Sequence, residues 1–297
     1  MADRPDLGED RWLPDRMAAL GFMLEGERRV ADEFIRLLDQ WFEAIRGSVF
    51  SGLGTQWATV DPLGVTGGAA TFARLLREFI DRAISWVIRE AYYRAVGEGY
   101  EFSNRPWVAQ HLQDVNNRLV RVPDEVFNLM RRQLDDGINE GESIPELAAR
   151  IDQELLNANA ERWVNRAVVI ARTETVSAYN GATQDAFEVM AEADLFDEGL
   201  EKVWLASMDA RTRDSHFAAD GQRVPLAGSF IVGGFPGRYP GDPLLPAKER
   251  IQCRCTVLYV EPDEETDMSM RGFRDEQDIA REIARRRERG IIRARDE

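Results

Sequence analysis

The sequence predicts an α+β protein in which a mostly α-helical N-terminal arm is followed by a small α+β module with a few short strands. Apolar residues recur at three- and four-residue steps over roughly the first two thirds of the chain, as in amphipathic helices. Near residue 195 this pattern ends, and short β-prone segments alternate with stretches rich in glycine and proline. We therefore predict a helical arm over 1–140, the α+β module over 141–262 and a tail over 263–297.

Two long helices are predicted in the arm. The first covers residues 14–50, where the apolar side chains form one stripe at helical spacing. Residues 51–69 contain many glycines and interrupt the pattern. The second helix covers residues 69–100 and has a stripe of its own. This stripe consists of Phe72, Leu75, Leu76, Phe79, Ile80, Ala83, Trp86 and Val87.

Three further helices are predicted over 122–141, 143–157 and 158–193. The helix over 143–157 begins with a capping box, in which Ser143 is the N-cap and Glu146 lies three residues later. The helix over 158–193 has a face of small residues, which lets another backbone approach closely, so we expect the module to cover it. This face consists of Val164, Ala167, Val168, Ala171, Thr175, Ala178, Ala182 and Ala186.

The module is predicted from a β-prone segment over 200–208 and a strand over 253–260. Between them, Asp209 is well placed as the N-cap of a short helix over 210–220, which ends at Gly221. The intervening stretch is rich in glycine and proline. These elements predict a compact unit whose strands are few and short.

The tail and the overall charge restrict the classes of partner. The tail begins with an acidic linker, and from Arg271 onward it has nine arginines and seven acidic residues. The whole chain carries a formal charge of −15, so direct binding of DNA by the acidic body is not expected. No secretory signal or membrane span is apparent, and two cysteines provide no disulfide framework. We expect a protein that is made in a reducing cytoplasm and has no contact with membranes.

Three residues of scarce types suggest a metal site. The chain has only two histidines and two cysteines. His216, Cys253 and Cys255 can together bind zinc, with Asp220 as a fourth ligand because it lies four residues after His216 on the predicted helix. However, structural zinc sites usually contain CxxC pairs. The CxC spacing on a strand puts both side chains on one face but farther apart.

Two other interpretations of these residues remain open. Cys253 or Cys255 can act as a nucleophile with His216 as its base, although thiols in buried strands are usually inert. The interpretation that we favour is structural: polar residues pin the glycine- and proline-rich loop, and the cysteines pack as small hydrophobic residues. We expect no catalytic residue and no cofactor, with zinc as the alternative. The expected structural polar network consists of Arg172, Asp209, Arg211, His216 and Asp220.

Four sequence pieces in a fixed order resemble the minor head protein family of tailed bacteriophages, typified by the phage Mu F protein. They are "ARTET", "VWLASMDARTRDSH", the "DG" that follows, and "GDPLLPAKERIQCRC". The resemblance covers roughly residues 140–262. The chain departs from the family pattern at Gln252, where asparagine is expected, and at Arg250, where an apolar residue is usual.

The resemblance implies a structural role in head morphogenesis. Such proteins are minor capsid components that associate with the portal protein and with the scaffold or major capsid protein during procapsid assembly. Some are implicated in DNA packaging or ejection. The implied location is the host cytoplasm during assembly and then the interior of the phage head, near the portal. The arm or the tail is expected to grip the portal or the inner shell.

Two alternative functions remain. The first is an ADP-ribosyltransferase-like enzyme built on "ARTET", which would require Glu174 to lie beside an open cleft. The second is an adaptor that binds proteins and is stabilised by zinc.

Overall fold

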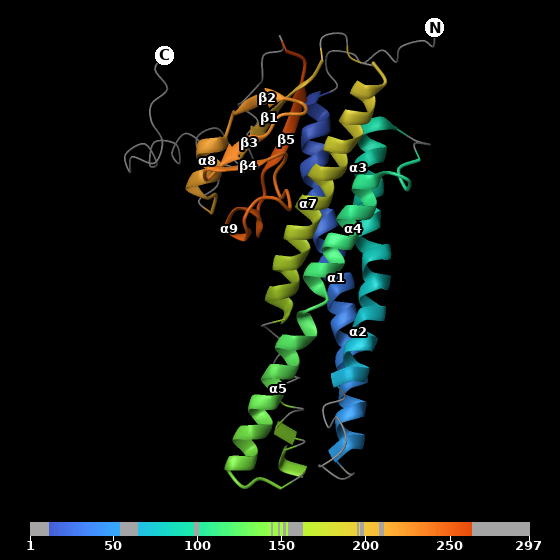
Figure 1. Cartoon of the computed structure of the whole chain (residues 1–297), viewed down its shortest axis with the longest axis vertical. Coiled ribbons are helices and arrows are strands. Elements are labelled where there is room, and N and C mark those ends of the chain that lie inside the picture. The colour runs from blue at the N-terminus through green and yellow to red at the C-terminus, as the bar shows by residue number, and fades with distance from the viewer. Residues whose placement is uncertain are drawn as a thin grey trace. The chain divides into compact units, whose positions relative to one another are not determined.

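A computed structural model describes residues 12–53, 65–97, 101–143, 145–147, 149–150, 153, 163–194, 196, 199–207 and 211–262. The chain divides into two compact units. The arm unit consists of 28–89 and 102–171, and the module unit of 1–27, 90–101 and 172–297. Long helices and a few short antiparallel strands confirm the predicted α+β class (Figure 1). The long helices are α1 (Trp12–Leu53), α2 (Val65–Phe79), α3 (Ser85–Val96), α4 (Pro106–Leu119), α5 (Val122–Asn139) and α7 (Trp163–Glu192).

The core of the arm unit is built around Trp41 of α1, whose side chain is fully buried. Its ring packs edge-on against Phe72 of α2 at 5.0 Å and against Phe127 of α5 at 5.7 Å between ring centroids. The indole Nε1 donates a hydrogen bond of 2.7 Å to the carbonyl oxygen of Gly68. A side chain at position 68 would collide with Phe127, so this contact between α2 and α5 requires glycine.

Between α2 and α3 the helix widens into the π-helical turn η1 (Ile80–Ile84), in which the Ser85 amide donates to the Ile80 carbonyl oxygen. The apolar pattern explains this turn. Buried residues recur every four positions along this segment, and four residues rotate a straight α-helix by about 400°, so the stripe would drift by about 40° at each step. A π-turn holds more residues than an α-turn and takes up part of this drift. These buried residues are Phe72, Leu76, Ile80, Ile84 and Ile88.

One half of the capping box predicted at Ser143 is present, the bond from the Ser143 backbone to the Glu146 carboxylate. The Ser143 backbone N–H donates to Glu146 Oε2 at 2.7 Å, and the Ser143 hydroxyl donates to the same oxygen at 2.6 Å. This pairing satisfies an amide that the first turn of a helix leaves without a partner. Much of the predicted helix over 143–157, and residues 158–162 before α7, lie outside the described residues.

The module unit contains two small sheets. In the first, β1 (Glu201–Leu205) lies between β2 (Arg223–Pro225) and β5 (Thr256–Val260), and both pairings are antiparallel. In the second, β3 (Phe230–Val232) pairs with β4 (Phe235–Gly237). These sheets and the short helices α8 (Asp214–Ala219) and α9 (Ala247–Arg250) gather beside the C-terminal half of α7 (Figure 1).

The face of small residues on α7 is largely buried, as predicted, although Val168 is 41% exposed and the side chain of Val164 lies outside the described part of the chain. In the module unit the loop before α9 approaches this helix so closely that Gly241 leaves no room for a side chain. A Cβ atom at Gly241 would lie 2.9 Å from the Cα atom of Ser177, and the φ angle of Gly241 is +84°. Both observations require glycine in the "GDP" sequence.

Two elements of the module are shorter than predicted. The strand predicted over 253–260 begins at Thr256, because Gln252 has a φ angle of +58° and turns the chain just before the cysteines. The helix predicted over 210–220 contains only α8, because Arg213 has extended backbone angles at its start and Asp220 has them at its end. Asp209 and the tail over 263–297 lie outside the described residues. Among the described helices, none combines the length and the apolar character that a bilayer span requires.

Candidate functional site

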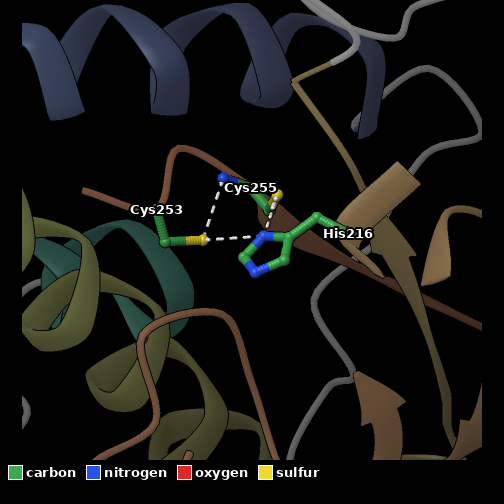
Figure 2. A group of neighbouring side chains, drawn as sticks. All are labelled: His216, Cys253 and Cys255. Atoms are coloured by element: carbon green, nitrogen blue, oxygen red, sulfur yellow. Dashed lines mark hydrogen bonds between the residues drawn. The ribbon is translucent and has the colours of Figure 1, made fainter. Parts of the chain in front are cut away.

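Helix α8 and the turn before β5 bring together the three scarce residues. Nδ1 of His216 lies 3.3 Å from Sγ of Cys255 and 3.6 Å from Sγ of Cys253, and Figure 2 shows both sulfur atoms turned toward this nitrogen. The three candidate ligand atoms all lie within 4.8 Å of one another. Solvent reaches only 2% of the His216 side chain and 1% of each cysteine. The CxC spacing therefore does not separate the sulfurs, because these residues lie in a turn.

The other ring nitrogen of His216 faces a buried carboxylate. Nε2 lies 3.3 Å from Oε2 of Glu249 on α9, and the Ser215 hydroxyl donates to the same oxygen at 2.6 Å. Gly233 makes room for this carboxylate, because a Cβ atom at that position would collide with it. Glu249 lies inside the motif segment "PAKERIQCRC", but no role was predicted for it from the sequence. Its place in this segment, close to both cysteines, was the available signal.

The two thiols differ in their ionisation. Burial raises the pKa of the Cys255 thiol well above its usual value. The hydrogen bond from the Cys255 side chain lowers the pKa of Cys253, against the effect of burial. A nucleophile must reach its substrate, and both thiols are buried. The arrangement therefore favours a structural role, in which these side chains hold parts of the fold together, over covalent catalysis.

Arg172 lies in a second polar cluster, also within the module unit. Its Nε atom donates to Glu27 Oε2 at 2.9 Å, and both side chains are largely buried. Burial raises the pKa of Glu27, while the positive charges of Arg172, Arg254 and Arg211 oppose this rise. Glu27 was missed by the sequence analysis because it lies 145 residues from its partner.

The remaining predicted residues occupy other places. Asp220 Oδ1 accepts a hydrogen bond of 3.0 Å from the Ala206 amide, and Asp220 is not a member of the His216 group. Arg211 is exposed and acts on Glu27 through its charge. Thus the structure joins His216 to the two cysteines, and it joins Arg172 to Glu27.

Two buried amides on α7, absent from the predicted site, connect this helix to the module. The Asn180 Nδ2 atom donates to the carbonyl oxygens of Pro240 and Cys255, each at 3.2 Å, and Thr256 donates to Asn180 Oδ1 at 3.1 Å. One turn later, Gln184 Nε2 donates to the Leu226 carbonyl at 2.9 Å. Two amides one turn apart beside a face of small residues were the signal for this contact.

The "ARTET" piece contacts the turn that carries the cysteines. The backbone N–H of Gln252 donates to Thr173 Oγ1 at 3.1 Å, and Gln252 has the left-handed φ angle of +58°. Among residues other than glycine, asparagine is one of the few enriched in this conformation. This geometry explains why asparagine is expected at the position that glutamine occupies here.

Lys202 of β1 is a buried cation held by neutral oxygen atoms. Its Nζ atom donates to Gln184 Oε1 at 3.1 Å and to the Arg238 carbonyl at 2.9 Å. Burial, with a smaller effect of the Arg238 charge, lowers the pKa of Lys202 to about 8. The unfolded chain then binds more protons than the folded protein above about pH 8, so stability should increase as the pH rises through this range.

We expect this pH dependence to be weaker in a Lys202→Met variant. Relative to that variant, the wild-type protein should gain about 2 kcal/mol of unfolding free energy between about pH 7 and about pH 9.5. Below about pH 8 Lys202 carries its proton in both the folded and the unfolded state of the wild-type protein, so this gain is absent there. Urea unfolding at a series of pH values measures the difference. If the unfolding free energies of the two proteins changed in parallel with pH, the lowered pKa of Lys202 would be contradicted.

Comparison with known proteins gives matches to the region that contains His216 and both cysteines. Residues 128–258 match the family described as "Phage Mu protein F like protein". The NAD(+)–arginine ADP-ribosyltransferase EFV of Enterococcus faecalis is 30% identical over 146 residues, which are 49% of this chain and 28% of that protein. The minor head protein GP7 of Bacillus phage SPP1 is 27% identical over 138 residues, which are 46% of this chain and 41% of that protein. The chain thus spans less than half the length of each of these relatives. No solved structure matches it.

Proposed function

We propose that the chain, whose residues 128–258 match the phage Mu protein F like family, is a minor structural protein of a tailed-phage head. In this role it joins the procapsid by contacting the portal protein and the scaffold or major capsid protein, and it remains in the head near the portal. The observation that carries the proposal is the family match. The minor head protein among the relatives agrees with it.

The chemistry of the chain supports protein partners. With a formal charge of −15, the chain as a whole is repelled by nucleic-acid phosphates. The buried charged and polar groups of the matched region also bond to one another and to backbone atoms, as Lys202 and Asn180 do. Such contacts fix the fold of a binding framework.

Deletion of residues 263–297 tests the role of the tail. The nine arginines from Arg271 onward outnumber the seven acidic residues of the same stretch and give it a net positive charge in an acidic chain, so their removal should weaken docking onto the assembling head. We expect at least about a tenfold drop in copies per procapsid, which corresponds to about 1.4 kcal/mol of binding free energy. Quantitative mass spectrometry of purified procapsids measures it.

The matched control replaces these nine arginines with glutamine and keeps the length of the tail. It should reproduce most of the loss if charge is responsible. An unchanged copy number in both variants would contradict the role of the tail. Absence of the wild-type chain from purified procapsids would contradict the head-protein proposal itself.

The transferase among the relatives makes enzymatic activity the second candidate function. The relevant residue is Glu174, which lies on α7 and is only 3% exposed, whereas a catalytic carboxylate must reach the bound dinucleotide. We therefore expect the purified chain to release no nicotinamide from NAD. Turnover of NAD that a Glu174→Gln substitution abolishes would overturn this expectation.

A further inference from the structure

The group formed by His216, Cys253 and Cys255 has the dimensions of a zinc site. In tetrahedral zinc sites with Zn–S bonds of about 2.3 Å and Zn–N bonds of about 2.1 Å, neighbouring nitrogen and sulfur ligands lie about 3.6 Å apart. The two nitrogen–sulfur distances here are 3.3 Å and 3.6 Å. The two sulfur atoms lie within 4.8 Å of each other, and two thiolates on one tetrahedral zinc ion lie about 3.8 Å apart, so binding an ion would move the side chains by no more than about 1 Å. Imidazole and thiolate are also the ligand types that zinc prefers.

The surroundings of the three side chains distinguish a metal site from ordinary packing. Without an ion, Nδ1 of a buried imidazole has only the two thiols as partners, and thiols form weak hydrogen bonds. The Cys255 amide also points at Cys253 Sγ, 3.5 Å away, and an amide donor stabilises a thiolate. All of the chain's cysteines and one of its two histidines converge at this point.

The carboxylate of Glu249 provides the support that metal-bound histidines usually have. Such a histidine binds the metal through one nitrogen and donates its other N–H to a carboxylate, which fixes the ring. Here Nδ1 faces the sulfurs, and Nε2 lies 3.3 Å from Glu249 Oε2. Nε2 makes no hydrogen bond of good geometry in the structure, so a small rotation of the ring would align it. The Ser215 hydroxyl holds the carboxylate in place.

We propose that His216 Nδ1, Cys253 Sγ and Cys255 Sγ bind one structural Zn²⁺ ion. Both thiols bind as thiolates, so their two protons are released to solvent as two Zn–S bonds and one Zn–N bond form. No aspartate or glutamate of the described part of the chain joins the group, so the three side chains are the protein ligands among the described residues. The ion links α8 to the turn before β5. This inference is independent of the role in the phage head.

Metal analysis of the intact wild-type chain tests the proposal without any substitution. We expect one zinc ion per chain after purification under reducing conditions. Replacement by Co²⁺ should give the intense ligand-field and sulfur charge-transfer absorption of tetrahedral thiolate coordination. Because both cysteines belong to the site, a thiol reagent should find both protected with zinc and both reactive after chelation. Folded wild-type protein that takes up neither metal under anaerobic conditions would overturn the proposal.

Substitutions identify the ligands. Cys253→Ser, Cys255→Ser and His216→Gln should each lower the zinc content at least about tenfold at micromolar zinc. His111→Gln is the matched control, because His111 is the only other histidine and is also buried, but it lies on α4 in the arm unit. That variant should keep its zinc. Zinc should also raise the melting temperature of the wild-type protein and of His111→Gln alike. Full zinc content in both cysteine variants would overturn the assignment.

Discussion

Replacing Asn180 with leucine is expected to destabilise the module unit by about 3 to 5 kcal/mol. Leucine has a similar shape but cannot donate to the carbonyl oxygens of Pro240 and Cys255 or accept from the Thr256 hydroxyl. Each of these buried groups loses its amide partner, at a cost of about 1 to 3 kcal/mol. Urea unfolding, followed by circular dichroism, measures the loss.

The control for this substitution is Thr183→Val on the same helix. The Thr183 hydroxyl donates only to the Tyr179 carbonyl, one turn earlier in α7, at 2.9 Å, and the side chain is partly exposed. Its removal leaves no buried group without a partner in the module, so we expect a change below about 1 kcal/mol. An Asn180→Leu variant as stable as Thr183→Val would show that the amide does not hold the module on α7.

Truncation of Trp41 to alanine is expected to cost the arm unit about 3 to 5 kcal/mol. The substitution leaves a cavity between Phe72 and Phe127 and removes the hydrogen bond to the Gly68 carbonyl. The expected result is a much lower midpoint of urea unfolding and a tendency to aggregate when the core opens. Circular dichroism at increasing urea concentration measures the midpoint.

Trp86→Ala is the matched control, because it removes the same side chain from a partly exposed position. The Arg29 guanidinium lies 4.3 Å from the Trp86 ring centroid, and this contact contributes about 0.5 to 1 kcal/mol. We expect the loss to be less than half of that for Trp41→Ala. Equal losses would show that Trp41 is not the centre of the arm core.

The long helices were predictable because their apolar periodicity extends over many turns. The predictions over 14–50, 69–100 and 122–141 correspond to α1, to α2 with α3, and to α5. Helix α4 was not predicted, because its buried side chains are few and one of them is His111. Strands β2, β3 and β4 have three residues each, which is too short for an alternating pattern.

The candidate site was only partly predictable. His216 and the cysteines were predictable because these residue types are rare in the chain. The cysteines were expected on a strand, but the chain turns at Gln252, which has a positive φ angle, and both sulfurs lie close to His216. No local pattern connects Arg172 with Glu27, because the two residues meet only in the folded chain. The buried amides of α7 resemble exposed polar residues until the module covers them.

The π-turn η1 is a place where the second helical segment can lose one residue without rotating the residues that follow. An α-turn bonds residue i to residue i+4 and a π-turn bonds residue i to residue i+5, so a gene that lost one codon between positions 80 and 84 would encode an unbroken α-helix whose later side chains face nearly the same way. Val87 and Ile88, both fully buried, would then stay in the core. One codon lost elsewhere in the segment would instead turn each later side chain by about 100°. A relative that is one residue shorter here should therefore lack that residue at this turn and keep the same apolar pattern after it, one position earlier.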